Sequence, residues 1–163
     1  MKININQLSK KPLIVEEIIN VPEDFKINFP LSKINSFKAK CTAVSYEDFI
    51  DVFAEIEVDV ILKSVYSLKE FSYVIKTNDE YHFSAYVNDE DSDLIEVKSN
   101  IINMDEYLLN LMSASIPVAP KIKGEKLPKS GEGYEIISED EYESNKENSY
   151  DSRFDKLKDI DFD

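Results

Sequence analysis

The chain has 163 residues with a single cysteine, and it carries a formal net charge of −14. A chain of this length forms one compact domain with appended segments. A single cysteine excludes an internal disulfide framework and a cysteine-rich zinc site. Because affinity for nucleic acid comes from Lys and Arg that neutralise phosphates, so acidic a protein is repelled by DNA and RNA at long range. Its charge favours association with basic proteins instead.

No targeting segment is evident in the sequence. Residues 1–6 lack the apolar stretch typical of a signal peptide, and no apolar run approaches the ~18 residues that span a bilayer. We therefore expect a cytoplasmic, soluble protein with no membrane partner and no DNA partner.

Alternation of apolar and polar residues predicts β-strands in the first half of the chain. Residues 2–8 and 36–44 alternate with period two, whereas residues 13–21 stay ambiguous between strand and helix. The clearest pattern is at 50–62, where seven apolar side chains share one face: Ile50, Val52, Ala54, Ile56, Val58, Val60 and Leu62. A helix, with its period of 3.6, would scatter that set around its circumference.

Further strands are predicted before the middle of the chain gives way to a helix. Residues 70–76 and 81–87 read as two strands joined by a polar turn at 77–80. Residues 94–98 predict a last strand after the acidic loop 88–93. Long alternating strands with short polar turns are typical of an antiparallel sheet or an open barrel.

One helix is predicted over about residues 103–116. Asn103 and Glu106 have capping-box spacing, and apolar residues then recur at i, i+3 and i+4 up to Pro117. The predicted fold class is α+β. It consists of a core domain, residues 1–120, with a mainly antiparallel sheet or open barrel and one packed helix. An extended acidic C-terminal tail, residues 121–163, follows and is partly flexible.

The tail differs in composition from the core. Residues 121–163 hold eight Lys or Arg and 13 Asp or Glu, a net charge of −5 that leaves −9 to residues 1–120. Residues 143–150 have almost nothing to bury, and we expect them to be mobile. Aromatic and aliphatic side chains nevertheless recur along the tail, as a contact segment requires. The candidate partner-binding residues are Tyr134, Ile136, Asp151, Arg153, Phe154 and Leu157.

The most basic stretch of the chain lies at residues 121–129. Its lysines are candidates for contact with RNA phosphates: Lys121, Lys123, Lys126 and Lys129. A flexible lysine-rich linker, interrupted by Glu125, is the alternative interpretation.

Residues with catalytic or metal-binding spacing are not found. The single histidine, His82, is interpreted as a side chain on the surface of the sheet, and Cys41 as a small buried hydrophobic residue. The carboxylates at 89–93 begin like an EF-hand loop, but Leu94 stands where such a loop needs glycine. We therefore predict no enzymatic activity, no cofactor and no metal.

Three segments together carry a family resemblance. Ile101–Pro117 is a hydrophobic helix that ends in proline, Lys129–Ile137 contains Ser-Gly-x-x-Tyr-Glu, and Asp151–Leu157 reads Asp-x-Arg-x-x-x-Leu. In this order, and with the start Met1–Leu8, the chain resembles the YceD-like family, the large ribosomal RNA subunit accumulation proteins, and is most similar to its Gram-positive branch.

The sequence departs from the family pattern at two places. The family's Cys-x-Arg-Cys-Leu corresponds to Ser64–Leu68, so a thiol or metal role of that motif cannot operate in this chain. In the terminal motif, Ser152 replaces a proline and Phe154 occupies a leucine position.

The resemblance implies a non-enzymatic bacterial ribosome-biogenesis factor that supports accumulation of the large-subunit (23S) ribosomal RNA. Our hypothesis from the sequence is an adaptor whose acidic surface or tail binds a basic ribosomal protein or a ribosome-assembly factor. The alternative is a direct RNA-binding module that acts through Lys121–Lys129.

Overall fold

The structure is a computed structural model, and it describes residues 1–47, 49–84 and 94–148. The chain divides into two compact units, Met1–Ile122 and Lys123–Asp163. The first unit contains all the strands, β1 to β7, and helix α1, and the second contains helix α2. None of the described helices is long and apolar enough to cross a membrane.

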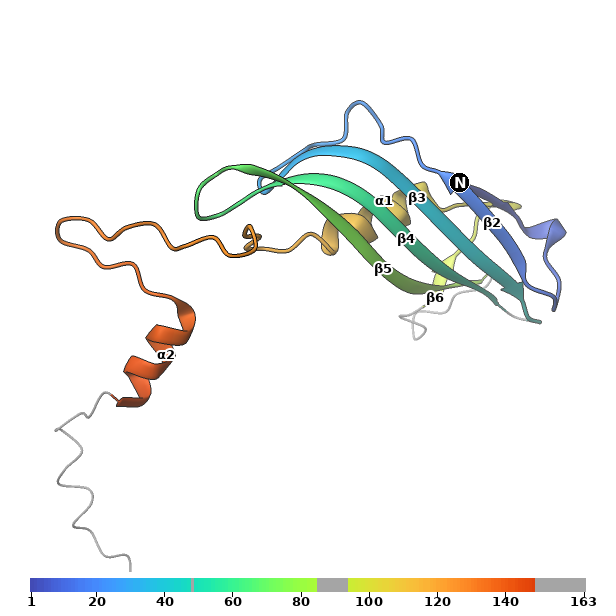
Figure 1. The fold of residues 1–163 in the computed structure, drawn as a ribbon. Helices are drawn as coiled ribbons and strands as arrows, with labels where there is room; N and C mark the ends of the chain where they lie inside the picture. Colours follow the sequence, from blue (N-terminus) through green and yellow to red (C-terminus); the bar gives the residue numbers. More distant parts are fainter. Residues whose placement is uncertain (48, 85–93, 149–163) are drawn as a thin grey trace, which may run out of the picture. The chain divides into compact units, whose positions relative to one another are not determined.

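A five-stranded, curved open sheet dominates the first unit (Figure 1). Its order is β2-β3-β4-β5-β6, with the bounds β2 Leu13–Ile18, β3 Leu31–Ser45, β4 Ile50–Lys63, β5 Glu70–Ser84 and β6 Leu94–Glu96. Strands β2 to β5 are antiparallel, and β6 pairs in parallel with the end of β5. The predicted α+β class with a mainly antiparallel sheet is confirmed, and the sheet is open rather than closed into a barrel.

A second, two-stranded sheet brings the start of the chain next to the segment before the helix. Strand β1 (Lys2–Asn4) pairs antiparallel with β7 (Ile101–Asn103). The predicted strand at 2–8 is therefore too long, because the Asn4 side chain accepts the N–H of Asn6 and starts the short 3₁₀ helix η1 (Ile5–Gln7). Strand β7 was not predicted.

The alternation in β4 corresponds directly to burial. Its apolar set faces inward, with Val52, Val58 and Val60 fully buried, and the intervening residues face outward. Cys41 on β3 pairs with Ala54 on this inner face. The thiol side chain is completely buried, which confirms its predicted place in the core.

Strand β5 corrects a sequence prediction. Residues 70–84 form one continuous strand, and residues 77–80 pair in register with Phe53–Ile56 of β4 instead of making a turn. Turn-forming residue types are tolerated here because Asn78, Asp79 and Glu80 are exposed at the margin of the sheet.

Two other strand boundaries also differ from expectation. Strand β3 begins at Leu31 rather than 36, because register shifts between Leu31 and Lys33 and between Ile34 and Ser36 break the period-two pattern. The ambiguous segment at 13–21 is a strand over 13–18.

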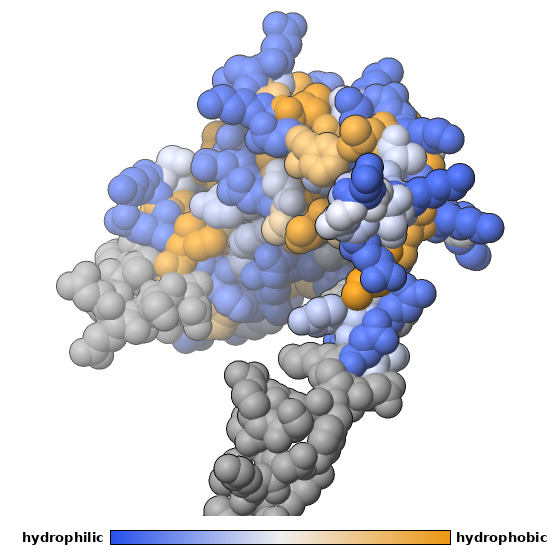
Figure 2. Space-filling model, turned by 90° about the vertical axis from the view of Figure 1, so that its left-hand side faces the viewer, coloured by the Kyte–Doolittle hydropathy of each residue, from blue (hydrophilic) through white to orange (hydrophobic). Residues whose placement is uncertain are grey.

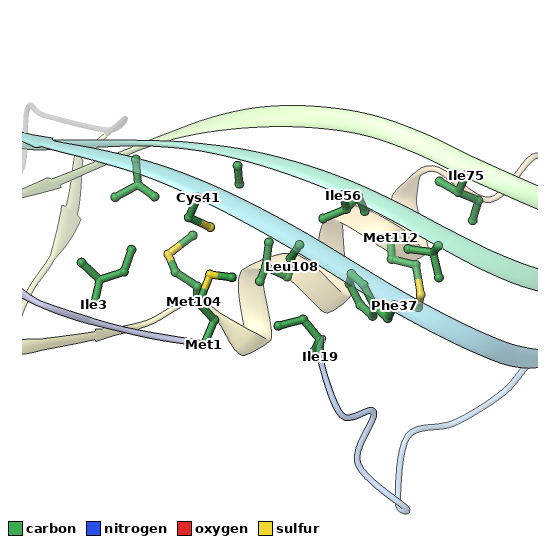
Figure 3. Packing of buried hydrophobic residues seen from close by; sticks show 14 of the residues in the cluster. Met1, Ile3, Ile19, Phe37, Cys41, Ile56, Ile75, Met104, Leu108 and Met112 are labelled. Atoms are coloured by element: carbon green, nitrogen blue, oxygen red, sulfur yellow. The ribbon is translucent and has the colours of Figure 1, made fainter. Parts of the chain in front are cut away.

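Helix α1 (Asp105–Ala114) packs on the inner face of the sheet. Figure 3 shows Met104, Leu108 and Met112 directed toward Cys41, Phe37 and Ile56 of the strands. All three helix-side residues are fully buried. Burial of apolar surface at about 25 cal/mol per Å² makes this layer the main source of stability in the unit.

The predicted capping box at Asn103 and Glu106 is wrong in its register. Asn103 belongs to β7, and the residue before the helix is Met104, whose side chain makes no capping bond. Asn103 still contributes, because its Oδ1 accepts the N–H of Asp105 at 3.3 Å.

The second unit contains a tight turn and the helix α2 (Glu139–Asn148). Of residues 143–150, which we expect to be mobile, 143–148 belong to α2, and 149 and 150 lie outside the described residues. The start of α2 is fixed by a reciprocal capping box: Ser138 Oγ accepts the N–H of Glu141 at 3.1 Å, and Glu141 Oε2 accepts the N–H of Ser138 at 3.0 Å.

The packing of α1 leads to a test of stability. Leu108→Ala is expected to lower the free energy of unfolding by about 3 kcal/mol, because it removes fully buried methyl groups and leaves a cavity. Asn110→Ala on the exposed face of the same helix is the control and should change it by less than about 0.5 kcal/mol. Urea unfolding followed by circular dichroism measures both, and equal losses would contradict the packing described.

Candidate functional site

The outer face of the sheet, opposite α1, carries two rows of alternating charge. One row runs Glu16–Lys40–Glu55 and the next runs Lys38–Glu57–Lys76 across β2 to β5. Lys40 Nζ lies 3.2 Å from Glu55 Oε2, and Lys76 Nζ lies 2.7 Å from Glu57 Oε2. The bond from Lys76 and its charge lower the pKa of Glu57.

These rows line a shallow groove of about 620 Å³ on the same face. Its lining holds three lysines and four glutamates, and two of the carboxylates form cross-strand ion pairs with lysines. Exposed pairs of this kind contribute little stability. The groove therefore offers a polar contact surface.

A second polar group lies further along the same face, where β4 starts and β5 ends. His82 Nδ1 lies 2.7 Å from Asp51 Oδ1 across the two strands. With Glu80 these residues offer three donor atoms within 4.8 Å of one another. A structural zinc site takes four ligands and a catalytic one takes three; in this structure the histidine and the aspartate of the group bind each other.

Sequence reasoning placed His82 on the sheet surface but missed its partner. The predicted turn at 77–80 put His82 in a separate strand whose pairing with β4 could not be deduced. Treating residues 70–84 as one uninterrupted strand paired with β4 would have placed His82 opposite Asp51.

Apolar side chains gather at the end of the sheet where β3 begins. A groove of about 390 Å³ there is lined in part by Phe25, Phe29, Ile116 and Val118. Phe29 is 57% exposed and Val118 91% exposed. Figure 2, which looks onto this side of the molecule, shows hydrophobic residues within a rim of hydrophilic ones.

Lys121, a predicted RNA-contact residue, belongs to the first unit. Its Nζ lies 5.9 Å from the centre of the Tyr66 ring, a cation–π distance. Lys123, Lys126 and Lys129 lie in the second unit and are exposed.

The predicted partner-binding residue Tyr134 is presented by a tight turn. The Gly131 carbonyl accepts the N–H of Tyr134 at 3.4 Å, and Gly133 has a φ of 86°, which favours glycine. A side chain at position 131 would collide with the Tyr134 ring, because a Cβ there would lie 2.3 Å from it. Ile136 is half-buried, and its N–H binds Ser130 Oγ at 2.9 Å. The Ser-Gly-x-x-Tyr element thus forms a compact loop with Tyr134 61% exposed.

The other partner-binding candidates lie outside the described residues: Asp151, Arg153, Phe154 and Leu157. The acidic loop 88–93 lies outside them as well.

Comparison with known proteins gives no assignment. No family model matches the chain, and it matches no curated protein and no solved structure. What the site does is therefore argued from its own residues.

Burial of Cys41 leads to a pH-dependent prediction. Removal from water raises the pKa of the thiol from 9.0 to about 11. The unfolded chain therefore loses this proton at a lower pH than the folded chain. The free energy of unfolding should fall by up to roughly 2 kcal/mol as the pH rises from about 9 to 11.

Cys41→Ala should flatten that fall, although its stability at pH 8 is lower because of the lost packing. Urea unfolding of both proteins at a series of pH values gives the comparison. Burial also raises the pKa of Tyr81, to about 12, so some slope persists in the variant. Parallel profiles for the two proteins would rule out the role of the thiol.

Proposed function

We propose that this protein is a non-enzymatic ribosome-biogenesis factor that supports accumulation of the 23S ribosomal RNA by binding a basic ribosomal protein or assembly factor. The observation that carries the proposal is a strongly acidic sheet scaffold, net −9 over residues 1–120, joined to a tail with exposed contact residues. The resemblance of the chain to the YceD-like family supplies the ribosomal context.

The titratable groups of the described core support a binding role. Cys41 is buried with a raised pKa, so it is a poor nucleophile. His82 is held by Asp51 on an open face. Glu55 and Glu57, which point the same way on β4, are each paired with a lysine. Within the described residues these arrangements are structural, and an acidic surface is what a basic partner requires.

Direct RNA binding is the second candidate, and one observation favours it. The chain segments at 64–69 and 120–121 meet, since Val65 N–H binds the Pro120 carbonyl at 2.9 Å and Lys121 lies over Tyr66. Lys69 closes the same turn, because its carbonyl accepts the N–H of Ser64. A lysine beside an aromatic ring is a common element of single-stranded RNA recognition.

Affinity purification from the host separates the two candidates. The tagged full-length protein should recover a basic ribosomal protein or assembly factor from lysate, and this protein should remain bound after RNase treatment. Mass spectrometry of both samples identifies it. Loss of every ribosomal component on RNase treatment would transfer support to RNA binding, and no ribosomal enrichment in either sample would contradict the ribosomal assignment.

A lysine variant and its control make this test sharper. Replacing Lys121, Lys123, Lys126 and Lys129 by glutamate should leave the RNase-resistant partner bound if the adaptor proposal holds. The same replacement at four other exposed lysines, Lys2, Lys10, Lys11 and Lys26, is the control for the added negative charge.

The tail gives an independent prediction. Deletion of residues 144–163 should abolish recovery of the partner and leave the thermal unfolding midpoint of the core within about 2 °C, because the two units are compact separately. Differential scanning calorimetry and the same purification measure the two effects. A coincident loss of folding would show that the tail is structural.

A further inference from the structure

Strand β5 has an open edge over most of its length. Its residues 70–83 all pair with β4, but β6 covers only His82–Ser84 on the other side. No described residue forms a backbone hydrogen bond along that other side of residues 70–81. We name this twelve-residue stretch the β5 edge, and Figure 1 shows it at the margin of the sheet.

The β5 edge lacks most of the devices that usually protect exposed strands. Natural proteins shield such edges with proline, bulges, outward lysines or inward-pointing charges, and of these the edge has one inner-face charge, Asp79, which pairs with the buried Ala54. Residues 70–81 contain no proline, and the β4–β5 register runs without a shift. The single lysine, Lys76, is bound to Glu57 on β4 at 2.7 Å and so is directed back over the sheet.

The side chains of the β5 edge suit a strand that continues the sheet. On the inner face Phe71, Tyr73 and Ile75 are apolar, and Tyr73 is 40% exposed. Val74 on the outer face is 47% exposed. An added strand would cover these residues and pair the open backbone groups, which is the mode of peptide recognition called β-augmentation.

Charge on the β5 edge is negative at both ends. Glu70 lies at one end and Asp79 and Glu80 lie at the other, about 33 Å away at roughly 3.3 Å per residue. None of these three carboxylates forms an ion pair with a lysine or arginine of the described residues. Glu70 accepts a bond from Ser32 Oγ and lies opposite Lys63 of β4, with which it forms no ion pair.

We propose that the β5 edge binds an extended segment of a basic protein, which adds to the sheet as a further strand. The segment carries Lys or Arg toward both ends, opposite Glu70 and Glu80, and apolar residues at alternate positions toward the inner face. This inference rests on the proposed function for the ribosomal identity of the partner, and it rests on the open strand and its charges for the mode of binding.

A second copy of the chain fits the β5 edge less well. Full antiparallel self-pairing over residues 70–80 places Glu70 of one copy opposite Glu80 of the other at both ends. Each copy also brings a net charge of −14, which opposes self-association.

Binding of a synthetic probe peptide to the full-length protein tests the inference. The probe has about twelve residues, with lysines toward both ends and valine at alternate positions, and carries a fluorescent label. Its anisotropy should rise on titration with the protein. A control peptide with the same lysines but prolines in place of the central valines cannot form a strand and should bind at least about tenfold more weakly.

Charge reversal locates the site. Glu70→Lys with Glu80→Lys should weaken the binding of the probe by at least about tenfold, because it sets like charges opposite one another at both ends. Glu23→Lys with Asp24→Lys makes the same change in net charge at two exposed positions of the segment that joins β2 to β3, and should change affinity by less than about threefold. Size-exclusion chromatography with light scattering checks that the variants are folded and reports any dimer.

Three outcomes would overturn the inference. These are equal binding of the proline peptide, equal losses of affinity in the two double variants, or a dimer that the reversals at Glu70 and Glu80 abolish.

The lysate purification separates this inference from the proposed function. If the protein with Glu70→Lys and Glu80→Lys still recovers the ribosomal partner, the β5 edge is not its binding site, and the proposed function is unaffected. If the probe binds at the β5 edge but no ribosomal protein is recovered, the proposed function is wrong, and the binding mode of the edge is unaffected.

Discussion

The structure depends on burial of one face of the β3–β4–β5 sheet beneath helix α1. Val52 and Leu62 on β4 and Leu108 on the helix are completely removed from water. Because side chains alternate along a strand, a shift of one residue would expose this whole set, so the buried face fixes the strand register. The fixed register in turn determines which residues meet on the outer face, where Asp51 lies opposite His82 and Glu57 opposite Lys76.

Sequence pattern was informative where burial controls the residue choice, and misleading where it does not. The strict alternation of β4 and the apolar face of α1 both arise because their apolar side chains are buried in the core, and both elements were predicted. At the margin of the sheet, polar residues such as Asn78 carry no packing constraint, and a turn was predicted inside a continuous strand. Long-range pairing of β7 with β1 outweighed the capping pattern at Asn103. The capping box at Ser138 and Glu141 was present in the sequence and would have predicted α2.

For the candidate site, the sequence indicated which residue types are available but could not place them together. It indicated an acidic protein without catalytic spacing and singled out Tyr134, which the structure presents on a glycine-dependent turn. The open side of β5 could not be predicted, because an edge is a property of strand order rather than of any one segment. A scaffold with a buried face, an outer face of alternating charge and an acidic open edge is well suited to hold an extended basic chain.

Amide hydrogen exchange along β5 tests this account most directly. In the protein alone, the outward amides of residues 70–81 should exchange rapidly. The exception is Glu80, whose N–H binds Asp79 Oδ1 at 3.0 Å, whereas the others have no partner within the described residues. With the lysine-bearing probe at saturation, these amides should become protected, while the amides of β3, central in the sheet, keep their rates. Protection confined to another surface, or already complete in the free protein, would contradict the claim that the β5 edge is the docking site.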